Sequence, residues 1–214
     1  KNFDKLKKKM KFFVIEDAAQ AFLSYDEKKI NCGTKNEIGC YSFSIAKPIH
    51  MIYGGFCVTN NKLIAQRLLA ARNNGMYPRF EKSALATTIG LNLKPSDLHA
   101  AVGIENLKTA KQKRLALLDN YNAYKKHINN KKIHFLEIQG TNSVPNFAQV
   151  LVKNRLSFLN FCKKNNIGVT TGLRGISETG MIKEKNSKFK NSFYLSKHLV
   201  RIPFGTGYKK SEII

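Results

Sequence analysis

The chain has 214 residues, of which 43% are hydrophobic and 24% charged, a composition typical of soluble globular proteins with a sizeable core. No stretch approaches the ~18 consecutive apolar residues of a membrane-spanning helix, and no signal-peptide apolar region follows the basic first residues. The formal net charge of +23 allows a nucleic-acid-binding surface, but the lysines are spread along the whole chain and accompany no RNP1-like run, zinc finger or basic zipper. We therefore favour solvated lysine-rich faces, which also suit an anionic small substrate.

The first part of the chain predicts a helix, a strand and a turn-rich segment. Residues 2–10 are typical of a short basic helix. The apolar run Lys11–Ile15, which ends in Glu16-Asp17, predicts a strand buried on both faces, as in a parallel α/β sheet. Residues 18–22 indicate a short helix, and the polar residues 24–36 a loop.

The next elements are two strands and two helical stretches. Residues 38–44 and 56–59 predict strands, and residues 62–74 predict a helix with an apolar side. Ser96 is a candidate N-cap for residues 97–128, which predict one long helix or two joined helices.

The character of the chain changes after about residue 112. The expected elements there are strands at 132–138, 147–153 and 169–173 and an amphipathic helix at 155–165. We therefore expect an α/β domain over residues 1–111 and a small α+β domain over residues 112–214.

The four cysteines, at positions 32, 40, 57 and 162, have the spacing of neither a zinc site nor a disulfide scaffold. A reducing cytoplasm is the location we expect. Cys57 in a predicted strand and Cys162 on an apolar helix face are expected in the core. The histidines have no metal-ligand spacing, so no metal site is expected.

Three features follow one another in an informative order. Asp17 ends a predicted buried strand, at the sheet edge where open α/β sheets bind ligands. Lys47 follows the next strand, where desolvation makes a lysine a candidate Schiff-base nucleophile. Gly54-Gly55 then allows close approach of the backbone to a bound group. Taken singly, Asp17 is better explained as a helix N-cap, Lys47 as a surface lysine and the glycines as a turn.

The order of the motifs resembles the DegT/StrS family of sugar aminotransferases, which depend on pyridoxal phosphate (PLP). The resemblance covers about residues 10–125, and the segments that carry it are Val-Ile-Glu-Asp-Ala-Ala-Gln (14–20), Tyr-Ser-Phe-Ser-Ile-Ala-Lys (41–47), Gly-Gly-Phe-Cys-Val-Thr-Asn (54–60), Ala-Arg-Asn-Asn-Gly (71–75) and Gly-Leu-Asn-Leu-Lys-Pro-Ser-Asp-Leu-His-Ala-Ala-Val-Gly (90–103). The ordered set is specific, whereas no single motif is.

The resemblance implies a role for each of five residues. Lys47 would carry PLP and move protons, and Asp17 would pair with the pyridine nitrogen. Gln20 would lie next to the ring and its 3′-oxygen, and Ser42 would donate to the cofactor phosphate. Asn92 would reach the phosphate of the other subunit's cofactor, so a homodimer with shared active sites is expected.

The resemblance also implies a fold and a reaction. The fold would be the latter part of the fold-type-I PLP-transferase large domain, over 1–111, with the small C-terminal domain over 112–214. The reaction would move an amino group, from glutamate by expectation, to a keto nucleotide-sugar for amino-sugar and surface polysaccharide biosynthesis. Lysine at position 47 argues against the family's dehydratases, which have histidine there.

Departures from the family pattern leave two alternatives open. Tyr53 stands where glutamate is common, and Lys94 where arginine is frequent. Family members are much longer, and the phosphate cup and ring-stacking residue of their N-terminal part are not upstream of Lys1, so we expect a fragment. The alternatives are a truncated non-catalytic or regulatory PLP-fold remnant and a basic nucleic-acid-binding protein.

Overall fold

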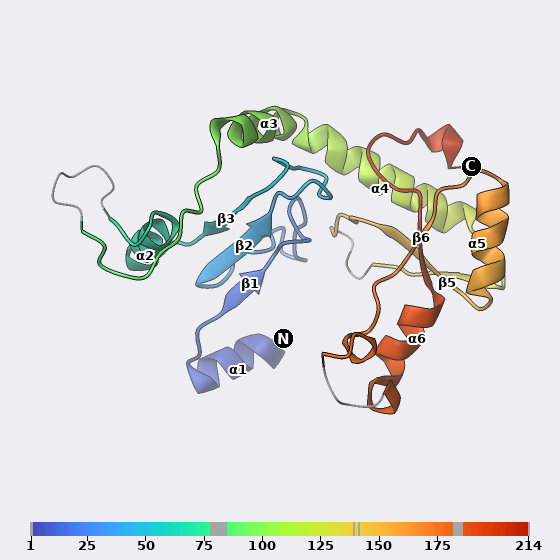
Figure 1. The fold of residues 1–214 in the computed structure, drawn as a ribbon, viewed down its shortest axis with the longest axis horizontal. Coiled ribbons are helices and arrows are strands. Elements are labelled where there is room, and N and C mark those ends of the chain that lie inside the picture. The colour runs from blue at the N-terminus through green and yellow to red at the C-terminus, as the bar shows by residue number, and fades with distance from the viewer. Residues whose placement is uncertain (1, 78–84, 139, 141, 182–185, 214) are drawn as a thin grey trace. The chain divides into compact units, whose positions relative to one another are not determined.

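The computed structural model describes residues 2–77, 85–138, 140, 142–181 and 186–213 (Figure 1). The chain forms two compact units. The first contains Lys1–Gln112 and Gly140–Val144, and the second contains Lys113–Gln139 and Pro145–Ile214. The sequence did not indicate that residues 140–144 return to the first unit. Tyr25 N donates to Asn142 O at 3.2 Å, and Val144 N donates to Ser24 Oγ at 2.9 Å, which ties this segment to the first unit.

The first unit is built on a three-stranded sheet in the order β1-β2-β3. Its elements are α1 (Asn2–Met10), β1 (Ile15–Asp17), β2 (Ile38–Ser42), β3 (Gly55–Val58), α2 (Lys62–Arg72) and α3 (Asp97–Lys108). β1 and β2 are parallel, and β3 is antiparallel to β2. The carboxyl ends of β1 and β2 therefore lie at one edge of the sheet.

Two predictions for the start of the chain are wrong. The strand predicted over Lys11–Ile15 begins only at Ile15, and Phe13 and Ile15 are 55% and 60% exposed rather than buried on both faces. In the described sheet β1 is an edge strand that pairs with β2 alone. Residues 18–22 form turns instead of a helix: Ala21 N donates to Ala18 O at 2.9 Å and Ser24 N to Ala21 O at 3.0 Å, the three-residue spacing of turns.

The core of the first unit is largely aromatic. The rings of Tyr41 and Phe56, which are cross-strand partners, stack with centroids 4.6 Å apart. Phe22 meets Phe43 edge to face at 5.0 Å, and Phe43 packs with Ile49, which is 1% exposed. This packing fixes the segment that follows β2, because Ile49 belongs to that segment.

The helix predictions after residue 60 are confirmed in type and approximate bounds. The side chain of Ser96 accepts a hydrogen bond from His99 N and caps α3, as predicted. The long helical stretch is two helices, α3 and α4 (Ala110–His127), separated by Thr109, the C-cap of α3. No helix in the described ranges is long and apolar enough to cross a lipid bilayer.

The second unit is an antiparallel four-stranded sheet with helices. Its sheet has the order β4-β5-β7-β6. The elements that follow α4 are β4 (Ile133–Phe135), β5 (Ala148–Val152), α5 (Arg155–Lys164), β6 (Thr170–Thr171), η1 (Ile176–Glu178), η2 (Asn186–Phe189), α6 (Lys190–His198), β7 (Leu199–Ile202) and η3 (Lys210–Glu212). The sequence predicted neither α6 nor the inner strand β7.

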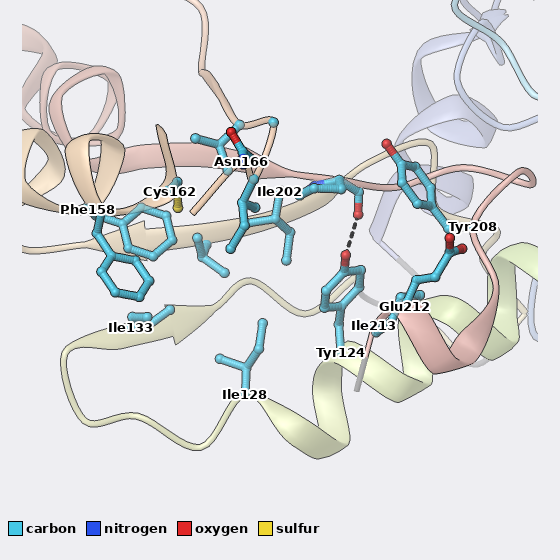
Figure 2. A pocket seen from close by; sticks show the side chains of 16 residues that line it. Tyr124, Ile128, Ile133, Phe158, Cys162, Asn166, Ile202, Tyr208, Glu212 and Ile213 are labelled. Atoms are coloured by element: carbon cyan, nitrogen blue, oxygen red, sulfur yellow. Dashed lines mark hydrogen bonds between the residues drawn. The ribbon is translucent and has the colours of Figure 1, made fainter. Parts of the chain in front are cut away.

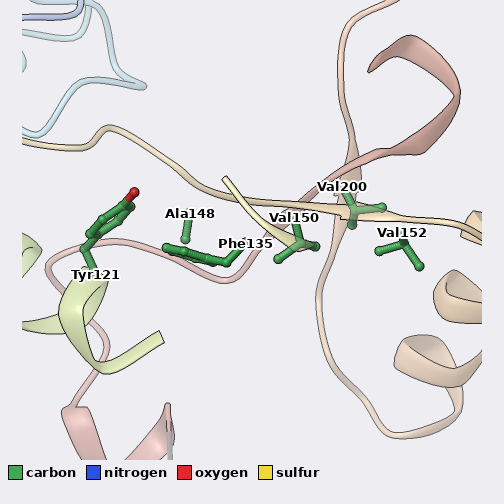
Figure 3. Close-up of a cluster of buried hydrophobic side chains, with 6 residues drawn as sticks. All are labelled: Tyr121, Phe135, Ala148, Val150, Val152 and Val200. Atoms are coloured by element: carbon green, nitrogen blue, oxygen red, sulfur yellow. The ribbon is translucent and has the colours of Figure 1, made fainter. Parts of the chain in front are cut away.

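The core of the second unit brings together side chains of the sheet and of α4 (Figure 3). Its buried members are Tyr121, Phe135, Ala148, Val150, Val152 and Val200. Tyr124 from α4 and Phe158 from α5 pack against this cluster. Cys162 on α5 is 2% exposed, as predicted, whereas Cys57 on β3 is exposed and not in the core.

Candidate active site

Two of the predicted residues lie where the parallel strands end. Asp17 is the last residue of β1 and Ser42 the last of β2, and Asp17 is the Cα partner of Cys40. Side chains at the carboxyl ends of parallel strands gather at the edge where α/β sheets bind ligands. The local fold therefore gives both residues the position that the sequence predicted.

The two neighbouring carboxylates of β1 have different surroundings. Glu16 accepts hydrogen bonds from the backbone N–H groups of Gly33 at 3.0 Å, Lys35 at 2.8 Å and Asn36 at 2.6 Å. Its carboxylate thus orders the loop before β2. Asp17 is exposed, and its Oδ1 accepts from Ala19 N at 3.1 Å. This single turn contact leaves the second oxygen of Asp17 available for a cationic partner.

Lys47 sits in a turn that follows β2. Its N–H donates to Ser44 O at 2.9 Å, and its side chain is half-buried. Burial lowers the pKa of the Lys47 amine below its usual value, and the negative charge of Asp17 opposes that shift. Asp17 and Lys47 are therefore in electrostatic reach of one another. A lowered pKa increases the fraction of neutral amine, the form that attacks a carbonyl.

The segment that carries Lys47 is held at both ends. Phe43 N donates to Gly54 O at 2.9 Å, and Met51 N donates to Phe43 O at 2.8 Å. A Cβ on Gly55 would lie 2.3 Å from Tyr41 O, so glycine there is required by the protein's own backbone. The close approach predicted for a bound group at Gly54-Gly55 thus has an internal explanation in the hairpin.

Two serine hydroxyl groups, those of Ser42 and Ser44, lie at the end of β2, shortly before Lys47 in the chain. Ser42 Oγ donates to Ser44 Oγ at 3.4 Å, and Ser44 N also points to Ser42 Oγ at 3.4 Å. His50 Nδ1 is buried and has no hydrogen-bond partner within the described part of the chain. The sequence indicated no role for Ser44, and it indicated for His50 a loop position close to Lys47, with contact to the substrate as the less favoured interpretation. The signal for both was their place three residues to either side of Lys47.

Gln20 and Asn92 lie in different places. Gln20 is exposed on the turn that follows Asp17. Asn92 is exposed and pairs through its backbone with Asn73 at the end of α2. In the residues that the structure describes, no hydrogen bond joins the Asn92 side chain to Asp17 or Lys47. The structure places Asp17 and Ser42 at the carboxyl ends of β1 and β2, with Lys47 in the turn after β2 and Gln20 in the turn after β1.

A separate cavity lies within the second unit (Figure 2). It has a volume of about 500 Å³ and is lined mainly by apolar side chains, including Ile128, Phe158 and Ile202. Tyr124 Oη at its wall donates to Pro203 O at 2.6 Å. None of the five predicted site residues lines this cavity, so it is distinct from the sheet edge around Lys47.

The fold is shared with solved sugar aminotransferases. The chain superposes on Helicobacter pylori PseC, an aminotransferase involved in the biosynthesis of pseudoaminic acid, with a TM-score of 0.83 and 19% identity, covering 98% of this chain and 58% of PseC. A putative sugar aminotransferase of Streptococcus pneumoniae, Spr1654 in its PLP form, gives a TM-score of 0.82 and 15% identity, covering 99% of this chain and 61% of that one. The expected fold class, part of a PLP-transferase fold, is confirmed.

The sequence comparisons agree with the fold. The sequence model of the DegT/DnrJ/EryC1/StrS aminotransferase family matches residues 1–213, and the chain belongs to this family. GDP-perosamine synthase of Escherichia coli O157:H7 is 34% identical over 125 residues, which are 58% of this chain and 33% of that enzyme. A UDP-4-amino-4,6-dideoxy-N-acetyl-beta-L-altrosamine transaminase of Campylobacter jejuni (strain 81-176) is 33% identical over 104 residues, 48% of this chain and 27% of that enzyme. The matched part thus spans about a third of each curated relative or less.

Proposed function

We propose that the protein is a PLP-dependent aminotransferase that transfers an amino group from an amino acid, with glutamate as the expected donor, to a keto nucleotide-sugar. The observation that carries the proposal is the position of a half-buried Lys47 after β2, where the negative charge of Asp17, the last residue of the parallel strand β1, influences the pKa of its amine. The names of the two curated relatives, a GDP-sugar synthase and a UDP-sugar transaminase, support the nucleotide-sugar class. The product would serve amino-sugar and surface polysaccharide biosynthesis.

The residues at the sheet edge fit the cofactor. PLP supplies the electron sink that lets a proton leave and return at the carbon bearing the amino group. Asp17 has an exposed carboxylate that can keep the pyridine nitrogen protonated, because an anion stabilises a neighbouring cation. Lys47 provides an amine whose pKa is lowered by burial, so it can bind the cofactor aldehyde and then take up and return the proton.

Three further residues would position the cofactor. Ser42 would donate its hydroxyl to the phosphate, and Gln20 would lie next to the ring oxygen. Asn92, which is exposed, would reach the phosphate held by a second subunit. The proposal therefore includes a homodimer with shared active sites. A cytoplasmic location belongs to it as well, because a reducing compartment keeps the four free cysteines as thiols.

The direct test of the function is Asp17→Asn in the protein expressed from its complete reading frame. The amide cannot hold the pyridine nitrogen protonated, so we expect PLP to bind while transamination of a keto nucleotide-sugar falls by orders of magnitude. Asp119→Asn, the same change on an exposed face of α4, is the matched control and should keep the wild-type rate. Retention of most of the activity by Asp17→Asn would contradict the role of Asp17, whereas a wild-type protein without transaminase activity would favour the non-catalytic remnant.

The shared site is tested by mixing two inactive variants, Lys47→Ala and Asn92→Ala, under subunit exchange. If Asn92 acts across the subunit boundary, each mixed dimer has one site with both defects and one site with none. Activity should then rise well above that of either parent. If Asn92 acts within its own subunit, every mixed site has one defect, and the absence of any rise would contradict the assignment.

A further inference from the structure

A row of three side chains crosses the sheet of the first unit next to the candidate active site. Asp17 on β1 is the Cα partner of Cys40 on β2, and Cys40 is the Cα partner of Cys57 on β3. Paired residues of neighbouring strands project from the same face of a sheet. The two cysteine sulfur atoms lie 3.7 Å apart.

The pairing geometry favours a covalent link between these cysteines. Phe43 N donates to Gly54 O at 2.9 Å, so Phe43 and Gly54, which continue the pairing of β2 with β3, form a hydrogen-bonded pair. Because hydrogen-bonded and non-hydrogen-bonded pairs alternate in antiparallel sheets, Cys40 and Cys57, three pairs further along, form a non-hydrogen-bonded pair. At such positions the Cα atoms are about 4.5 Å apart, within the usual range of disulfides.

The other cysteines offer no such partner. Cys32 is half-buried in the loop before β2, and Cys162 is 2% exposed on α5 in the other unit. No other pair among the four cysteines, all of which the structure describes, makes a sulfur–sulfur contact. The contact is therefore specific to one pair.

The two thiols of the pair differ in environment. Cys57 is exposed, whereas Cys40 is half-buried. Burial raises the pKa of the Cys40 thiol, and the hydrogen bond with Cys57 and the charge of Asp17 raise it further. A small oxidant thus meets Cys57 first, while Cys40 stays a protonated thiol in contact with it.

We propose that Cys40 and Cys57 form a reversible disulfide when the protein meets a hydroperoxide. The Cys57 thiolate attacks one peroxide oxygen and the O–O bond breaks. Cys57 becomes a sulfenic acid, while hydroxide leaves from hydrogen peroxide or an alkoxide leaves from an organic hydroperoxide. Cys40 loses its proton and attacks the Cys57 sulfur, which forms the S–S bond and releases the sulfenic oxygen as water. The two thiols lose two electrons and two protons in all, and one hydroperoxide gains them. A dithiol reductant reverses the change by exchange.

The disulfide would act on the segment that carries Lys47. Residues 41–56 lie between the two cysteines, so the bond closes this segment into a loop and ties β2 to β3 at its neck. It also replaces the thiol beside Asp17 by a disulfide sulfur with no proton to donate. Oxidation would therefore change the surroundings of Asp17 and the segment that carries Lys47.

The test is chemical mapping of thiols in the protein expressed from its complete reading frame, before and after treatment with hydrogen peroxide. We expect two of the four cysteines to lose reactivity toward an alkylating agent and a dithiol to restore both. Trypsin leaves both cysteines in one peptide, because proline follows Lys47. Chymotrypsin, which cuts after Phe43 and Tyr53, should therefore be used to release a cross-linked pair of peptides.

Variants separate the proposed pair from the other thiols. Cys32→Ser and Cys162→Ser should keep the peroxide-dependent loss of two thiols, whereas Cys57→Ser should abolish it. Free Cys40 and Cys57 after peroxide treatment, or a disulfide of either residue with another cysteine, would overturn the proposal. The thiol map of the wild-type protein alone gives this answer, so the test stands even if every variant fails to fold. Since this readout does not depend on transamination, it is independent of the proposed function.

Discussion

The core of the second unit allows a quantitative prediction. Val150 on β5 and Val200 on β7 are cross-strand partners, and both are fully buried, with 0% exposure (Figure 3). Val200→Ala removes two methyl groups, which at about 0.8 kcal/mol each amounts to about 1.6 kcal/mol of lost burial. The sheet cannot close the space, because β7 is held between β5 and β6, so the cavity adds about 1 kcal/mol. We expect the free energy of unfolding to fall by about 2.5 kcal/mol.

The assay is urea unfolding followed by far-UV circular dichroism, since the chain has no tryptophan. For an m-value of about 2 kcal/mol/M, the midpoint should move down by about 1 M. Leu156→Ala, at a position on α5 that is 70% exposed, is the control and should change stability by less than ~0.5 kcal/mol. Equal midpoints for the two variants would refute the reasoning that Val200 is a core residue.

Three further changes test other parts of the structure. Gly55→Ala should destabilise the β2–β3 hairpin by about 1–3 kcal/mol, because its Cβ would lie 2.3 Å from Tyr41 O; urea unfolding measures it. Asn120→Ala should cost about 1–3 kcal/mol in the same assay, because the buried amide donates to two backbone carbonyls of residues 205 and 208 at 3.0 Å each. The pKa of the Glu178 carboxyl is lowered to about 2, mainly by Lys197 and then by Ser196 and a backbone N–H. The charged carboxylate therefore stabilises the fold fully above about pH 4.3, the usual pKa of glutamate, and this stabilisation is lost as the pH falls toward 2. The unfolding midpoints of wild type and Glu178→Gln should therefore differ at pH 7 and converge at about pH 2.

The changes at Gly55 and Glu178 each have a matched control. Gly207→Ala adds a methyl group where no atom lies within 4 Å, and it should leave the midpoint unchanged. Glu105→Gln removes an exposed ion pair with Lys108 and should show little dependence on pH. A midpoint gap for Glu178→Gln that widens below pH 4 would show that the sign of the argument is wrong. An Asn120→Ala variant with the stability of the wild type would show that the two hydrogen bonds of the Asn120 amide do not stabilise the fold.

The sequence predicted elements where local signals agreed with the tertiary fold. Ser96 caps α3 because a serine before a helical pattern offers its oxygen to the first free N–H groups, a local effect. The strand β7 was missed because its four residues follow directly on α6, and a short apolar run does not distinguish a strand from a helix end. The position of β1 was also misjudged, since the apolar run from residue 11 continues into a strand only from Ile15.

The candidate site was predicted by the order of motifs rather than by any single residue. Asp17 and Lys47 are separated by thirty positions (47 − 17 = 30), and only the parallel pairing of β1 with β2 brings them into electrostatic reach. That pairing is a tertiary effect, which a resemblance captures and local propensity does not. The pairing of Cys40 with Cys57 was not predicted, because it depends on the register of β2 against β3.

The most direct test of the account is to identify the lysine that binds PLP. The protein, expressed from its complete reading frame and loaded with PLP, is reduced with borohydride, which makes the lysine–cofactor bond permanent, and is then digested and mapped by mass spectrometry. We expect a pyridoxyl group on Lys47, whereas Lys113, whose pKa burial also lowers, should stay unmodified. A pyridoxyl group on another lysine, or none at all, would contradict it.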